Sequence, residues 1–209
     1  MKVPEFVTAY PRLFHVTEVD AWPGIEQNGL LSAASLLDLY DVEADRRREL
    51  VSQLRPEPVE LTADDLPPAL LHAQNTIDAT KLEASLTDIT LPDWLTMLSD
   101  FVSLAPTPAR LASVESSWGY RPRVVVILNS RTVVAEHQWR LRLSHINTSA
   151  TTPAARPRGA ATFQPLGTFA HPKKDWAAEV AVQGGIRDIG NHLLGVEKRF
   201  PDGTVEKIR

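Results

Sequence analysis

Three short segments place polar side chains on stretches that otherwise have the sequence of buried β-strands. They are "FHVT" with His15 and Thr17, "SHINTSATT" with Asn147, and "WAAEVAV" with Glu179. An unpaired polar group inside a protein costs roughly 1–3 kcal/mol, so three such strands need an explanation. Each residue could bond to neighbouring backbone or lie at a strand end in water. Taken together, they point to a polar site.

Metal chemistry is one alternative, because the chain has six histidines. None of them forms the HxH, HxxxH or HExxH spacing of common metal sites. We therefore expect no metal. The six are His15, His72, His137, His145, His171 and His192.

Other common catalytic motifs are also missing. The chain lacks the GxSxG of many serine hydrolases and the GxGxxG and GxxxxGK[ST] of nucleotide-binding loops. It has no cysteine, which excludes disulfides, thiolate catalysis and cysteine metal sites. Paired carboxylates of the glycosidase type stay open, because a sequence does not show how far apart they lie.

The composition is that of an ordinary cored protein. The 209 residues are 43% hydrophobic and 23% charged, with a net charge of −4. That balance gives no global positive field that would favour a nucleic-acid partner. The longest aliphatic run, "VVVIL", is too short to cross a bilayer, and the first residues lack a signal-peptide core. We expect a cytoplasmic protein with no membrane contact.

Local patterns predict helices in the first half of the chain and strands in the second. A strand is expected over 10–16, followed by a helix that begins near Pro23 and ends at Gly29. Residues 32–42 and 43–54 read as two more helices, the second with solvated arginines at 46–48. Proline-rich turns and short helices then alternate, the firmest helix lying at 90–104.

The second half predicts strands at 124–130, 139–148 and 179–186, the middle one burying the face that carries Trp139. A hairpin that turns at Pro201 ends the chain. We therefore predict one α+β domain over residues 1–209, with a helical insertion at about 41–112 and a C-terminal hairpin at about 194–209.

Two segments resemble the ADP-ribosyltransferase superfamily, particularly its DarT-like branch. "LFHVTEVDAWPGIEQNGLLS" resembles the first motif, in which a strand ending in His-x-Thr leads into a helix that closes with Gly-Leu. "AAEVAVQGGIRDI" is similar to the C-terminal motif, a strand with one glutamate among aliphatic residues. The two segments occur in the expected order and cover about a fifth of the chain. The whole pattern also resembles a bacterial family of about this length.

The resemblance implies a fold, a substrate and two catalytic residues. The fold would be a split mixed or antiparallel sheet with flanking helices, and NAD would be the substrate. Glu179 would bond the 2′-hydroxyl of the nicotinamide ribose and stabilise the cation that grows as nicotinamide leaves. His15 would orient the dinucleotide with help from Thr17. The acceptor would be a protein or a nucleic acid, and the chain could serve as a toxin or defence effector with an antitoxin partner.

The same resemblance suggests further cofactor contacts, each beside a structural alternative. Asn147, Thr148 and Ser149 would line the cleft, or they form a loop where a strand stops. Arg156 and Arg158 would grip the NAD pyrophosphate or an acceptor phosphate, or they are solvated loop charges.

One departure from the family leaves a second function open. Related sequences carry an aromatic segment that stacks the nicotinamide, whereas the corresponding "SDFVSLAPTPARL" has only Phe101. Other aromatic side chains would have to replace it: Tyr40, Trp118, Tyr120 or Phe163. If none does, the chain would be an inert relative that binds a nucleotide or a partner protein without turnover.

Overall fold

The computed structural model describes residues 1–151, 155–170 and 177–209 as an α+β fold built on two four-stranded antiparallel sheets. The α+β prediction is confirmed. In the first sheet the order is β1 (Arg12–Thr17), β6 (Arg123–Asn129), β11 (Leu193–Arg199) and β12 (Val205–Lys207). In the second it is β5 (Phe101–Leu104), β9 (Glu179–Gln183), β7 (Leu141–Ser144) and β8 (Gln164–Pro165).

The two sheets meet where β1 and β5 exchange one pair of backbone hydrogen bonds. Phe14 N donates to Ala105 O over 3.0 Å, and Ala105 N donates to Phe14 O over 2.7 Å. Inward-facing residues of both sheets share one hydrophobic core, in which Val126 of β6 and Val180 of β9 are fully buried. The continuous β-branched run of β6 suits a strand buried on both faces, as the sequence predicts.

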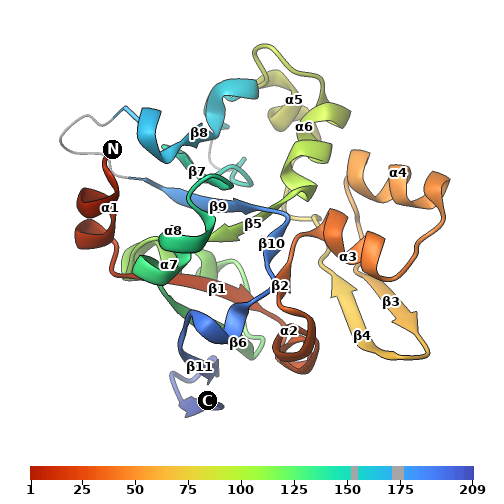
Figure 1. The fold of residues 1–209 in the computed structure, drawn as a ribbon. Helices are drawn as coiled ribbons and strands as arrows, with labels where there is room; N and C mark the ends of the chain where they lie inside the picture. The colour runs from red at the N-terminus through yellow and green to blue at the C-terminus, as the bar shows by residue number, and fades with distance from the viewer. Residues whose placement is uncertain (152–154, 171–176) are drawn as a thin grey trace.

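Helices surround these sheets (Figure 1). Pro23 lies in the first turn of α2 and Gly29 follows its end, as predicted. Gly29 has a φ of +86°, and a Cβ there would lie 2.4 Å from Arg187 Cα, so only glycine fits. The α-helices are α1 (Val3–Ala9), α2 (Trp22–Asn28), α3 (Ala33–Leu39), α4 (Ala44–Ser52), α5 (Ala79–Ala84), α6 (Leu91–Ser99), α7 (Pro108–Ser116) and α8 (Ser130–His137). Short 3-10 turns are η1 (Val19–Ala21), η2 (Ala160–Thr162), η3 (Leu166–Thr168) and η4 (Ile189–Asn191), and β2 (Leu30–Leu31) pairs with β10 (Gly185–Ile186).

A side lobe lies next to the sheets and has a small core of its own. It consists of α3, α4 and the hairpin of β3 (Val59–Ala63) and β4 (Leu66–Leu71), to the right in Figure 1. Leu37, Leu50 and Leu61 pack together there. The predicted insertion at about 41–112 is therefore not all helical. Pro67 and Pro68 fit within β4 because they lie where its register with β3 shifts, between the pairs Leu61–Ala69 and Ala63–Leu66, and neither proline is paired there.

Four further expectations are corrected or confirmed. The predicted helix at 90–104 ends at Ser99, and residues 101–104 form β5 instead. Trp139 was expected on a buried strand face, but β7 begins at Leu141 and Trp139 is 72% exposed. The C-terminal hairpin is confirmed as β11 and β12. The arginines at 46–48 are solvated, in exposed ion pairs.

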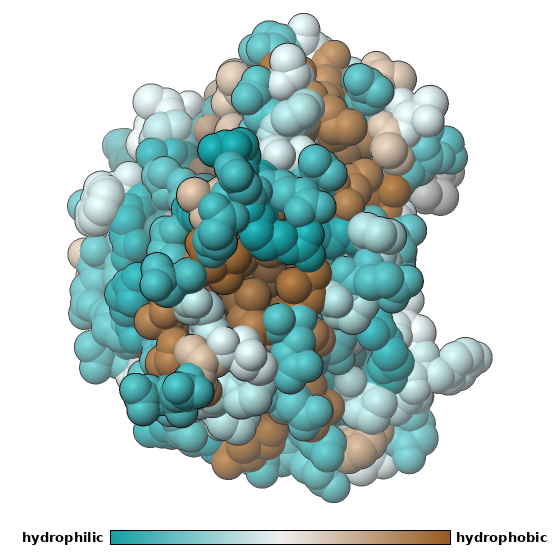
Figure 2. Space-filling model, turned by 90° about the vertical axis from the view of Figure 1, so that its right-hand side faces the viewer, coloured by the Kyte–Doolittle hydropathy of each residue, from teal (hydrophilic) through white to brown (hydrophobic). Residues whose placement is uncertain are grey.

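None of the described helices is long and apolar enough to span a membrane. On the face that carries the side lobe, Figure 2 shows a patch of apolar surface surrounded by hydrophilic side chains.

Candidate functional site

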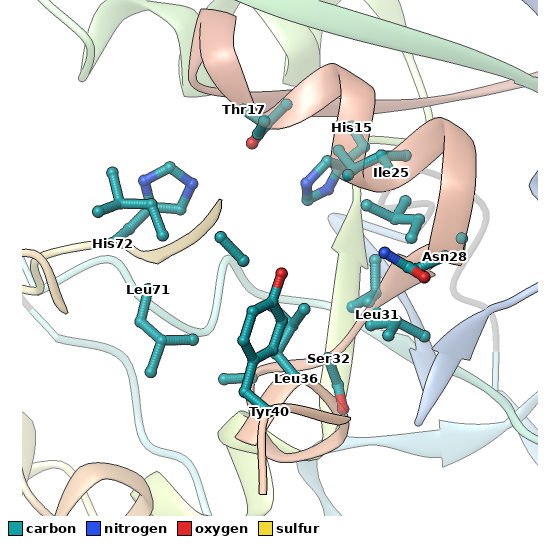
Figure 3. Close-up of a pocket in the computed structure, with 18 of the residues that line it drawn as sticks. His15, Thr17, Ile25, Asn28, Leu31, Ser32, Leu36, Tyr40, Leu71 and His72 are labelled. Atoms are coloured by element: carbon teal, nitrogen blue, oxygen red, sulfur yellow. The ribbon is translucent and has the colours of Figure 1, made fainter. Parts of the chain in front are cut away.

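Two adjoining cavities between the sheets and the side lobe form one cleft. The first is lined by His15, Thr17 and Tyr40 among others, and Figure 3 shows these side chains around it. The second is lined by Thr148 and Glu179 among others. The two cavities lie next to each other and share five lining residues, which are Ala33, Arg55, His72, Phe101 and Ser103.

His15 is fixed by the backbone of β5. Its Nδ1 lies 2.9 Å from the carbonyl oxygen of Ser103. A carbonyl oxygen only accepts, so Nδ1 carries the ring hydrogen and Nε2 keeps a free electron pair. Burial lowers the pKa of His15 to about 4, against a smaller opposing effect of the Ser103 bond. The imidazole is therefore neutral at neutral pH and offers a hydrogen-bond acceptor to the cleft.

Glu179 opens β9 and is almost enclosed, with 7% of its surface exposed. One carboxylate oxygen, Oε2, accepts hydrogen bonds from both the backbone N and the Oγ1 of Thr148, each 2.8 Å long. Burial raises the pKa of Glu179, while hydrogen bonds from Ser103 and Thr148 and the charge of Arg158 partly oppose that rise. Thr148 donates no hydrogen bond to Oε1, the other oxygen of this carboxyl group.

Ser103 joins these two groups. Its carbonyl oxygen holds His15, and its side chain lies close enough to the Glu179 carboxyl group to lower the pKa of that group. An imidazole acceptor from the N-terminal part of the chain and a carboxyl group from its C-terminal part therefore flank one residue of β5. The pair could receive two hydroxyl groups of one ligand and face a developing positive charge.

The arginines predicted to bind phosphate lie outside this cleft. Arg158 is buried, and its guanidinium donates to the carbonyl oxygens of Thr148 (2.6 Å), Ala150 (2.9 Å) and Arg156 (2.9 Å). It holds the loop that carries Thr148 against Glu179. Arg156 instead makes a long 3.4 Å bond to His145 O and lines neither cavity.

The remaining predicted contacts are divided between the cleft and its surroundings. Ser149 and Phe163 line the second cavity. Asn147 lines neither cavity, and its Oδ1 accepts a hydrogen bond from Ser149 N at 3.1 Å. Of the aromatic candidates, Tyr40 and Phe163 face the cleft, whereas Tyr120 is 94% exposed.

Trp118 packs edge-on against His72, with ring centroids 5.4 Å apart, and is not part of the cleft lining. Phe101 and Phe163 pack with their centroids 4.7 Å apart, so the second cavity has an aromatic wall.

Three cleft residues were not found from the sequence. Ser103 was missed because its segment was read as the end of a helix, although a serine between aliphatic residues is itself a signal. His72 and Arg55 come from the part of the chain read as an insertion, and burial lowers the pKa of both. Arg55 Nη1 donates to Leu50 O and Nε to His72 O, which leaves Nη2 without a hydrogen bond to any described residue.

The cleft does not contain the metal-type cluster found among the described residues. That cluster consists of Glu136, His137, Asp188 and His192, none of which lines either cavity.

Comparison with protein families finds a match over most of the chain. The model of DUF7002, described as a family of unknown function, matches residues 11–193. No curated protein matches the chain. The matched span contains every residue of the cleft named above.

Proposed function

The chain belongs to the DUF7002 family, and from the cleft we propose that it is an NAD-dependent ADP-ribosyltransferase acting on a protein or nucleic-acid acceptor. The observation that carries the proposal is the convergence of His15 and Glu179 on Ser103. The sequence resemblance pointed to His15 and Glu179 without using the tertiary structure. These two residues lie on β1 and β9, far apart in the chain, and both line the cleft.

In the proposed reaction Glu179 provides the charge. The glycosidic bond between C1′ of the ribose and the nicotinamide nitrogen breaks, and its electron pair leaves with nicotinamide. A carboxylate fixed beside C1′ stabilises the resulting cation, because Thr148 already holds the charge in place and it needs no reorganisation. The acceptor nucleophile then bonds to C1′ and gives its proton to Glu179. Thr148 fixes Oε2 and leaves Oε1 for the ribose 2′-hydroxyl.

The other cleft residues would bind and orient NAD. His15 Nε2 accepts a ribose hydroxyl hydrogen, since its neutral ring keeps Nδ1–H on Ser103. Arg55 replaces Arg156 and Arg158 as the pyrophosphate contact, because it lines both cavities and its Nη2 has no hydrogen bond to a described residue. The aromatic wall of Phe101 and Phe163 takes the place of the missing nicotinamide-stacking segment.

The test is release of nicotinamide from NAD by the purified chain, followed by chromatography. Glu179→Gln keeps the shape and an acceptor for Thr148, and Glu60→Gln is the matched control on the exposed surface of β3. The proposal expects release by the wild-type chain and the control, and its loss in Glu179→Gln. Equal release in both variants would refute it.

A catalytically inert module that binds a nucleotide or a partner protein is the second candidate. The enclosure of Glu179 favours it, because a carboxyl group with two hydrogen bonds from Thr148 also has the surroundings of a structural residue. Calorimetry separates the two candidates. Binding of NAD or ADP-ribose with no nicotinamide release supports the inert module.

A role as a toxin or defence effector, held in check by an antitoxin, extends the transferase proposal and rests on the sequence resemblance alone. It expects that expression in bacteria slows growth and that Glu179→Gln restores it. Normal growth with active wild-type enzyme would refute the extension and leave the transferase proposal standing.

A further inference from the structure

Histidine and carboxylate side chains gather where the end of α8 meets the turn after β10, outside the cleft. Glu136 and His137 close α8, and Asp188 and His192 stand on either side of η4. One donor atom from each lies within 4.8 Å of all the others. His137 and His192 are buried, while the side chains of Glu136 and Asp188 are 49% and 32% exposed. The cluster is thus open to solvent on its acidic side.

His137 has a fixed hydrogen-bonding role. Arg140 Nη2 lies 2.8 Å from its Nδ1, and a guanidinium can only donate. Nδ1 therefore accepts, and the ring hydrogen is on Nε2, which lies 3.1 Å from Asp188 Oδ1 and donates to it. His137 fixes the position of Asp188 and has no free electron pair directed into the cluster.

His192 can take the opposite arrangement. Its Nδ1 lies 2.9 Å from Thr132 Oγ1, and that hydroxyl donates its own hydrogen to Asn129 O over 3.1 Å. With the ring hydrogen on Nδ1, which donates it to the hydroxyl oxygen, His192 Nε2 carries an electron pair; with the hydrogen on Nε2, the ring donates to Asp188 Oδ2. Nε2 lies 3.1 Å from Asp188 Oδ2 and 3.6 Å from Glu136 Oε2.

In the tautomer with the hydrogen on Nδ1, three electron-pair donors converge on one point. The carboxyl groups of Glu136 and Asp188 also face each other closely enough to interact. Arg140 is the cation next to the cluster, and its Nη1 is committed to the carbonyl oxygens of Gln183 and Gly185. A positive charge between the three donors would remove their mutual repulsion.

We propose that His192 Nε2, Asp188 Oδ2 and Glu136 Oε2 bind a divalent zinc ion, with solvent completing its coordination. Zinc bonds to nitrogen and oxygen are about 2.0–2.1 Å, which sets tetrahedral ligand atoms about 3.3 Å apart. The two separations from His192 Nε2, 3.1 and 3.6 Å, lie on either side of that value. The longer one is too long for a hydrogen bond but suits two ligands of one ion.

The surrounding contacts match those of a metal site. A ligating histidine usually donates its other ring N–H to an oxygen, as His192 does to Thr132 in that tautomer, and a ligating carboxylate is itself hydrogen-bonded, as Asp188 is by His137. The ion would join α8 to the segment that leads into β11, so its role is structural. The expectation of no metal rested on histidine spacing, whereas only one ligand of this site is a histidine.

The experiment measures zinc binding to the full chain after treatment with a chelator and dialysis. Calorimetric titration with zinc chloride, with manganese chloride as a second ion, gives stoichiometry and affinity. Glu136→Gln removes one ligand from an exposed position and should fold, and Glu83→Gln on the exposed face of α5 is the control. His192→Gln provides a second ligand variant, with circular dichroism to check its fold.

We expect one zinc per chain, a higher Tm with zinc, and a loss of affinity of about 10-fold or more in Glu136→Gln but not in Glu83→Gln. Cobalt in place of zinc should give visible absorption bands that Glu136→Gln changes. Absence of binding would overturn the proposal and leave the cluster held by hydrogen bonds alone. Binding that Glu136→Gln leaves unchanged would also overturn it, because the ion would then be on other histidines. Neither outcome bears on NAD turnover.

Discussion

Replacing Glu179 by glutamine should separate activity from stability. The side chain is 7% exposed, and both hydrogen bonds from Thr148 go to Oε2 and not to Oε1. If the carboxylate stabilises a developing cation, losing its charge should lower nicotinamide release by about 10²–10³-fold, or about 2.7–4 kcal/mol. The substitution keeps the size of the side chain, so a packing defect would not explain such a loss.

The effect on folding should be small because two contributions oppose each other. Glutamine can still accept both hydrogen bonds from Thr148, although each loses charge assistance worth about 1 kcal/mol. Removing a buried charge returns a comparable amount, since burial is the largest influence on the Glu179 pKa and raises it. We expect the free energy of unfolding to change by about 1 kcal/mol or less, a shift in Tm of about 2–4 °C.

The difference in stability between Glu179→Gln and the wild-type chain should change with pH in a defined direction. An acid with a raised pKa in the folded state holds its proton after the unfolded chain has released it, so stability falls as pH rises from about 4.5 through the folded pKa. Glu179→Gln lacks this loss and should gain stability relative to wild type as pH rises through that window. Urea unfolding between pH 4 and 8 measures it. A stability difference that is flat with pH would refute the buried, protonatable carboxyl on which the argument depends.

Three other perturbations test separate parts of the structure. The wild-type chain should lose stability as pH falls from about 6.5 toward 4, because burial lowers the pKa of His15 to about 4 and the unfolded chain takes up the proton first. His15→Gln should abolish this loss. Urea unfolding of both chains measures it, and equal pH profiles would contradict the prediction. Gly29→Ala should lower the free energy of unfolding by about 2 kcal/mol or more, because Gly29 has a φ of +86° and a Cβ there would meet the Arg187 backbone. Gly24→Ala is the control, since a Cβ at Gly24 would lie 3.9 Å from its nearest atom, Pro68 O. Similar Tm values for the two variants would refute this prediction. Arg55→Met should raise the Kd for NAD by about 10-fold in calorimetry, because it removes the guanidinium group proposed to bind the pyrophosphate. The control is Arg48→Met on the exposed surface. An unchanged Kd in Arg55→Met would show that Arg55 does not bind NAD.

Features with a local cause could be read from the sequence. The strand of His15, the buried β6, the start and end of α2 and the C-terminal hairpin follow from side-chain pattern, proline and glycine. The same pattern marked Glu179 as a polar residue in an apolar strand. These signals lie within a few residues of each other, so neighbouring side chains alone determine them.

Features that depend on distant partners could not be read in this way. Residues 101–104 become a strand because β9 pairs along their length and β1 bridges to Ala105 at their end, which also brings Ser103 between His15 and Glu179. Arg158 is drawn inside by carbonyl oxygens of a loop whose path the sequence does not specify.

The sequence by itself pointed to His15, Thr17, Thr148 and Glu179 as polar residues of one site, and it placed His15 and Glu179 on strands. Only the tertiary structure decided that they share a cleft, that Arg55 and His72 complete it, and that Asp188 and His192 meet Glu136 elsewhere. The physical reason is that local propensity acts over a few residues, whereas a site is made by burial and hydrogen bonding between segments far apart in the chain.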